Sequence, residues 1–133
     1  MGDTIDQEYL SRAATWHLMD GHVVVHDSFS PKAPRMITME PWHEAAFSMA
    51  DGQHTVGEFI QQMGSQYEGG MPAGLPQQVH GIIRDLVKEG ILTLHREKKA
   101  LPLYFAEEIS KIPPEVRKAL MEKDGIIPRA PNG

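Results

Sequence analysis

The sequence predicts an α+β domain, and three observations support that prediction. Alternating apolar and polar residues flank an Asp-Gly pair near the N-terminus, a pattern typical of a β-hairpin. Apolar residues recur at helical spacing in three later segments. The chain has 133 residues, of which 41% are hydrophobic and 23% charged, as is ordinary for one globular domain. We therefore expect one domain over residues 1–97 and a C-terminal extension over 98–133.

The predicted hairpin has strands over 15–19 and 22–26, joined by Asp20-Gly21. A third strand is predicted over 35–39, which completes an N-terminal three-stranded antiparallel sheet. Because side chains alternate between the two faces of a strand, one face of the hairpin is apolar and suited to cover a core. The residues of that face are Trp16, Leu18, Val23 and Val25.

Three helices are expected after this sheet. The first begins near Pro41, since proline is tolerated in the first turn of a helix. Thr55 and Glu58 have the spacing of a capping box and predict the start of the second. The third, over 76–89, has the clearest helical periodicity and is followed by Gly90, which suits a C-terminal cap.

A short strand is predicted over 91–95, directly after the third helix. This order favours a winged-helix-like fold in which the three-stranded sheet packs on a three-helix bundle. In the extension, proline starts a short helix predicted over 114–121, so the extension is expected to be a partly helical tail. The end of the chain, 128–133, is expected to be disordered.

The composition excludes several kinds of chemistry. With no cysteine, the chain has no disulfide, thiolate nucleophile, iron–sulfur cluster or cysteine-based zinc site.

The sequence shows no apolar stretch of about 20 residues and no secretory signal, so we expect a cytoplasmic protein that does not bind membranes. The net charge is −5, which disfavours binding to nucleic acid. No nucleophile elbow, phosphate loop or zinc-protease motif is present, and we expect no enzymatic activity.

Three histidines, His17, His22 and His26, share the second face of the predicted hairpin. Imidazoles at that spacing are able to grip a metal ion. The alternative is a solvated hairpin face, which we favour because a metal site also needs second-shell acceptors and a rigid platform. We therefore expect neither a metal nor another cofactor.

Short motifs follow the hairpin in an order that is more specific than any one of them. They are Asp51-Gly52-Gln53-His54-Thr55-Val56, then Ile60, Tyr67, Val79, Ile83, Leu86 and Gly90-Ile91-Leu92-Thr93-Leu94. Over about residues 10–95 this order resembles the PqqD-like family, the peptide-recognition domains that serve the biosynthesis of ribosomally made, modified peptides. The resemblance implies a non-catalytic peptide chaperone, which binds a precursor leader peptide and presents it to a modifying enzyme, for example one of the radical type.

In that family the leader peptide adds as an extra strand to the edge of the third strand, and its side chains enter a groove beside the third helix. The resemblance implies a receiving edge and a facing wall in this chain. Those residues are Arg35, Met36, Ile37, Thr38 and Met39 on the edge, and Val79, His80, Ile83, Arg84 and Val87 on the wall.

Two alternatives stay open at this point, namely a winged-helix regulatory domain and an unrecognised enzyme accessory subunit. A winged-helix regulatory domain that binds DNA or a protein partner has the same order of elements. The exposed charges of the third helix argue against DNA, since Arg84 and Lys88 are matched by Asp85 and Glu89. A homodimer is also compatible with the sequence.

Overall fold

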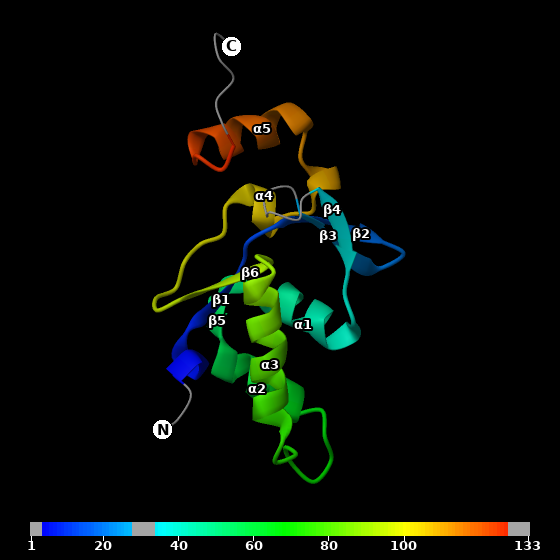
Figure 1. The fold of residues 1–133 in the computed structure, drawn as a ribbon, viewed down its shortest axis with the longest axis vertical. Coiled ribbons are helices and arrows are strands. Elements are labelled where there is room, and N and C mark those ends of the chain that lie inside the picture. The colour runs from blue at the N-terminus through cyan, green and yellow to red at the C-terminus, as the bar shows by residue number, and fades with distance from the viewer. Residues whose placement is uncertain (1–3, 28–33, 128–133) are drawn as a thin grey trace.

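The computed structural model describes residues 4–27 and 34–127. Over these residues the chain is an α+β structure with two three-stranded antiparallel sheets and five helices (Figure 1). The predicted α+β class is thereby confirmed, whereas the second sheet was not predicted. The disorder expected for 128–133 lies outside the described residues.

The first sheet is the one that the sequence predicts. It consists of β2 (Thr15–Met19), β3 (His22–Asp27) and β4 (Arg35–Thr38), in the order β2-β3-β4. In its hairpin Met19 lies opposite His22, as expected.

The hairpin turn is of the type that Asp-Gly favours. Asp20 has a φ of 54° and Gly21 a φ of 81°, the two positive angles of a type I′ turn. The residues that close such a turn exchange both backbone hydrogen bonds, and further pairs along the ladder alternate between bonded and non-bonded. The turn therefore fixes which backbone groups of every strand in this sheet point to which neighbour.

The second sheet has the order β5-β1-β6 and consists of β1 (Tyr9–Arg12), β5 (Asp51–Thr55) and β6 (Leu92–His95). Only β6 was predicted from the sequence, as a solitary strand. Gly52 has a φ of 79°, a positive value that is typical of turn glycines, although Gly52 lies within a strand. The register between β1 and β5 shifts at this point, which is the mark of a β-bulge.

The helices match their sequence signals closely. The Thr55–Glu58 capping box is present with both of its hydrogen bonds. Gly90, after the third helix, has a φ of 77°. In the described ranges no helix has the length and apolar character needed to cross a membrane. The helices are α1 (Pro41–Met49), α2 (Val56–Gly64), α3 (Leu75–Lys88), α4 (Leu103–Ala106) and α5 (Pro114–Lys123), with short 3-10 turns η1 (Thr4–Gln7) and η2 (Ile109–Lys111).

The main core lies between the two sheets and α1–α3. Its buried residues come from every one of these elements, for example Leu10, Val25, Phe47, Phe59 and Ile83. The extension has a small cluster of its own, formed by Tyr104, Ile112 and Met121. α4 and α5 lie at one end of the molecule, and α2 lies toward the opposite end (Figure 1).

Candidate functional site

The outer edge of β4 is open within the part of the chain that the structure describes, because β4 pairs there with β3 alone. Val25 lies opposite Ile37 in this ladder. Counting alternate pairs from the hairpin turn, Val25 and Ile37 exchange their backbone hydrogen bonds. The neighbouring residues of β4, Met36 and Thr38, therefore direct their N–H and C=O groups to the open edge.

Two side-chain contacts agree with this assignment. By the same alternation, the N–H of Val23 points toward the side of β3 on which β4 lies. It lies beyond the end of β4, so it has no partner in that strand. It donates to Glu44 Oε1 at 3.2 Å. On the opposite edge of the sheet, the N–H of Leu18 donates to Glu108 Oε1 at 3.3 Å. A side chain of the extension thus occupies part of the β2 edge.

A groove of about 430 Å³ lies between β4 and the C-terminal half of α3. Four of the five predicted edge residues line it, namely Arg35, Ile37, Thr38 and Met39. The fifth, Met36, is adjacent to them in the strand and is 59% exposed. The structure therefore brings four of the five predicted edge residues to one groove.

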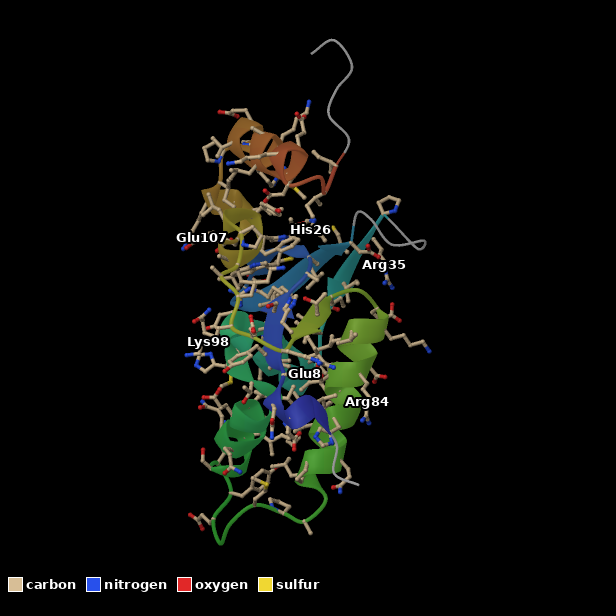
Figure 2. The ribbon with its side chains drawn as sticks, turned by 90° about the vertical axis from the view of Figure 1, so that its left-hand side faces the viewer. Glu8, His26, Arg35, Arg84, Lys98 and Glu107 are labelled. Atoms are coloured by element: carbon tan, nitrogen blue, oxygen red, sulfur yellow. The ribbon has the colours of Figure 1, made fainter. Side chains whose placement is uncertain are left out.

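The predicted helix wall is placed differently. Val79 and Ile83 have no exposed surface, because the apolar stripe of α3 faces the main core. His80 is 8% exposed, and its Nε2 lies 2.5 Å from Asp6 Oδ1. Arg84 and Val87 are exposed on α3 but do not line the groove. Figure 2 shows Arg84 farther along α3 from the end that lies near Arg35.

The helix residues that do line the groove are Asp85, Leu86, Lys88 and Glu89. Their spacing of i, i+1, i+3 and i+4 describes one face of a helix, at the margin of the apolar stripe. That margin was visible in the sequence, since Leu86 belongs to the stripe and its three neighbours are charged. The sequence did not show that the last turn of α3, rather than its middle, lies beside β4.

Arg35 ties the strand to the helix. Its Nε lies 2.6 Å from Asp27 Oδ2 on β3, and its Nη2 lies 2.7 Å from Glu89 Oε2 at the end of α3. Hydrogen bonds to these two carboxylates raise the pKa of Arg35 above its ordinary value. The charge on Arg35 is therefore balanced within the protein. The other charged side chains of the groove are Glu40, Asp85 and Lys88.

The three hairpin histidines do not converge on one point. His17 Nδ1 lies 2.5 Å from His26 Nε2, whereas His22 Nδ1 lies 3.4 Å from Glu44 Oε2. Across residues 4–27 and 34–127, no group of three or more His, Asp or Glu side chains is arranged to hold a metal ion. The His face is thus divided between a contact of two imidazoles and a contact of His22 with Glu44.

Comparison with known proteins gave no further assignment. A scan against protein-family models, a search of the curated proteins and a search of the solved structures each returned no match. The resemblance to the PqqD-like family therefore stays a prediction from the sequence, and the function proposed below depends on the geometry of the β4 edge.

Proposed function

We propose that this protein is a non-catalytic peptide chaperone, which binds an extended precursor peptide along β4 and presents it to a modifying enzyme in the cytoplasm. The observation that supports the proposal is the open edge of β4 beside a groove of about 430 Å³. A guest strand at that edge satisfies backbone groups that are otherwise left to water, and its alternate side chains meet the groove. We also propose that α1–α3 with the sheets form a winged-helix-like arrangement, as in the family that the sequence resembles.

Both the backbone edge of β4 and the groove must contribute to the free energy of binding. Met36 and Thr38 offer two donors and two acceptors, and four hydrogen bonds of about 1 kcal/mol each contribute about 4 kcal/mol. Ordering a peptide and losing its translational freedom cost at least as much. Binding must therefore also bury side chains against the apolar part of the groove, which Ile37, Met39 and Leu86 provide.

The charges of the groove favour a protein or peptide partner over nucleic acid. Its described lining has three carboxylates, on Glu40, Asp85 and Glu89, against the two cations Arg35 and Lys88. Arg35 is already paired with two carboxylates. A phosphate backbone needs a surplus of positive charge, which this surface does not supply.

The test uses the full chain and a random-peptide display library, from which binders are selected and then titrated individually. Thr38 is exposed and its N–H faces the open edge, so Thr38→Pro removes a donor for the guest strand without removing a bond to β3. We expect Thr38→Pro to weaken binding about tenfold or more, the equivalent of 1.4 kcal/mol. Thr38→Val keeps the N–H, and is the matched control that should bind as the parent does.

Amide hydrogen exchange of the bound protein locates the peptide. New protection over residues 35–39 is the expected result. Equal affinity of the Thr38→Pro and Thr38→Val variants, or protection confined to the extension over 101–121, would contradict strand addition at β4.

A further inference from the structure

A second cavity lies away from the β4 edge, between the second sheet and the C-terminal extension. Its volume is about 820 Å³. Pockets that bind small molecules usually enclose about 300–1,000 Å³ and combine apolar walls with a few polar groups. The cavity has the size of such a site, and nothing in the proposed peptide chemistry uses it.

One wall of the cavity is a row of polar side chains on the second sheet. Ser11 on β1 lies directly opposite Thr93 on β6, and Thr93 Oγ1 lies 3.1 Å from His95 Nε2. Ser11 is only 3% exposed, and its Oγ has no hydrogen-bond partner. A buried hydroxyl without a partner is unusual in a folded protein and calls for an explanation.

The opposite wall comes from the extension and is mainly apolar. Leu101, Pro102, Tyr104 and Phe105 line it. The hydroxyl of Tyr104 donates to Asp124 Oδ2 at 2.7 Å, so that the polar end of this ring is already satisfied. The cavity thus has one polar side and one apolar, aromatic side.

The charges of the wall favour an anion. Its cationic groups are Arg12 and Lys99, and its carboxylate is Asp124, which is bonded to Tyr104. Arg12 directs its guanidinium to backbone carbonyls of residues 47, 48, 105 and 106, so it serves the structure. Burial and the nearby Lys99 lower the pKa of His95, while Glu8 opposes them, so this imidazole is neutral at pH 7. Lys99 is therefore the remaining cation of the wall, and its charge acts on His95.

We infer that this cavity binds a small aromatic carboxylate. The carboxylate would lie near Lys99 and the hydroxyl of Thr93, above the buried hydroxyl of Ser11, and the ring would lie against Tyr104 and Phe105. Such a ligand places its one charged group on the polar wall and its apolar surface on the aromatic wall. The site is independent of the β4 edge, so either proposal can fail without the other.

The test is a titration of the full chain with 2-naphthoate, followed by amide chemical shifts in NMR spectra. Naphthalene-2-carboxamide is the uncharged isostere. We expect saturable shifts at Thr93, Lys99 and Tyr104, and binding of the carboxylate roughly fivefold tighter than that of the amide, as one charge-assisted hydrogen bond would give.

Two lysine variants distinguish a specific effect of Lys99 from the general effect of losing one positive charge. Lys99→Gln should abolish the preference for the carboxylate over the amide. Lys98→Gln is the matched control, because Lys98 is the adjacent exposed lysine and does not line the cavity; it is labelled in Figure 2. The inference is overturned if millimolar 2-naphthoate gives no saturable shifts, if shifts lie outside the cavity, or if Lys99→Gln and Lys98→Gln retain the same preference.

Discussion

The imidazoles of His17 and His26 form a short contact on the outer face of the first sheet, which requires at least one of them to be neutral. Burial lowers the pKa of His26, and the positive charges of His17 and Arg117 lower it further. Glu108 also lies near the ring of His17. This pair is therefore a place where the stability of the fold depends on pH.

The sign of that dependence follows from the lowered pKa of His26. The unfolded chain binds the proton near the ordinary value of 6.5, whereas the folded chain binds it only at lower pH. The contribution to stability is thus present above pH 6.5 and is lost as the pH falls below it. We expect the free energy of unfolding, measured with urea, to fall between pH 7.5 and 5.5, and to fall less in His26→Gln.

His22→Gln is the control for this measurement, because the side chain of His22 is 78% exposed and does not contact the pair. A pH dependence that is the same in His26→Gln as in the parent chain would assign the effect to other groups. His95 is one of them, since its pKa is also lowered by burial and by Lys99.

At the scale of elements, β5 depends on a close approach between two segments. A Cβ atom on Gly52 would lie 1.7 Å from the carbonyl oxygen of Lys99, and the N–H of Lys99 donates to the carbonyl of Gly52 at 2.9 Å. The start of the extension therefore lies directly on the second sheet. Only glycine permits that contact.

Gly52→Ala and Gly21→Ala form a matched pair that tests this contact. Both glycines have a φ near 80°, but a Cβ on Gly21 meets nothing within 4 Å. Gly21→Ala should therefore lower the free energy of unfolding by only about 1–2 kcal/mol, the cost of holding a residue with a Cβ at a positive φ. Gly52→Ala adds a clash with backbone and should destabilise by several kcal/mol more, as urea denaturation would show. Equal costs would mean that the segment around Lys99 moves away without penalty.

Comparison of these elements shows what the sequence could predict. The hairpin, the start of α2 and the extent of α3 have local signals, namely Asp20-Gly21, the Thr55 capping box and the apolar stripe that ends at Gly90. β1 and β5 have none. The residues of β5, Asp-Gly-Gln-His-Thr, have low strand propensity and are held extended by their partner strand, which lies some 40 residues away in the chain.

The candidate site was predictable to the same extent. The edge residues 35–39 follow from the hairpin and the position of the third strand, both of which are local features. The helix wall does not follow from local features. Periodicity identifies the stripe of Val79 and Ile83 that faces the core, but which neighbouring face of α3 lines the groove depends on how α3 crosses the sheet. The contacts of the extension are also invisible in the sequence, since most of them end on backbone carbonyls.

At the scale of the whole molecule, the extension and the first sheet depend on each other. The carbonyl of Phe105 accepts from Arg12 Nε at 2.9 Å and from Trp16 Nε1 at 2.8 Å. Glu108 covers part of the β2 edge. The sheet therefore has one edge partly occupied by its own chain and one edge open, which directs any added strand to β4.

A chain that ends at residue 97 tests this arrangement. It loses two hydrogen bonds of Arg12 and one each of Trp16, Leu18 and Gly52 to the extension, and at about 1 kcal/mol each these five amount to roughly 5 kcal/mol. We expect a folded but less stable domain that self-associates through the uncovered β2 edge, as light scattering after size exclusion would detect. A monomer with the parent's stability would show that the extension contributes nothing to the sheet.

The bond between Trp16 and the Phe105 carbonyl also makes the indole an optical reporter. Its N–H is held by an oxygen of the extension, and its ring lies edge-on against Phe47 with centroids 6.0 Å apart. Whenever the extension leaves the sheet, that indole exchanges a fixed oxygen for water, and its fluorescence emission shifts to longer wavelength. Trp42 packs against the main core and supplies a steady background, so the seating of the extension can be followed in the unlabelled protein.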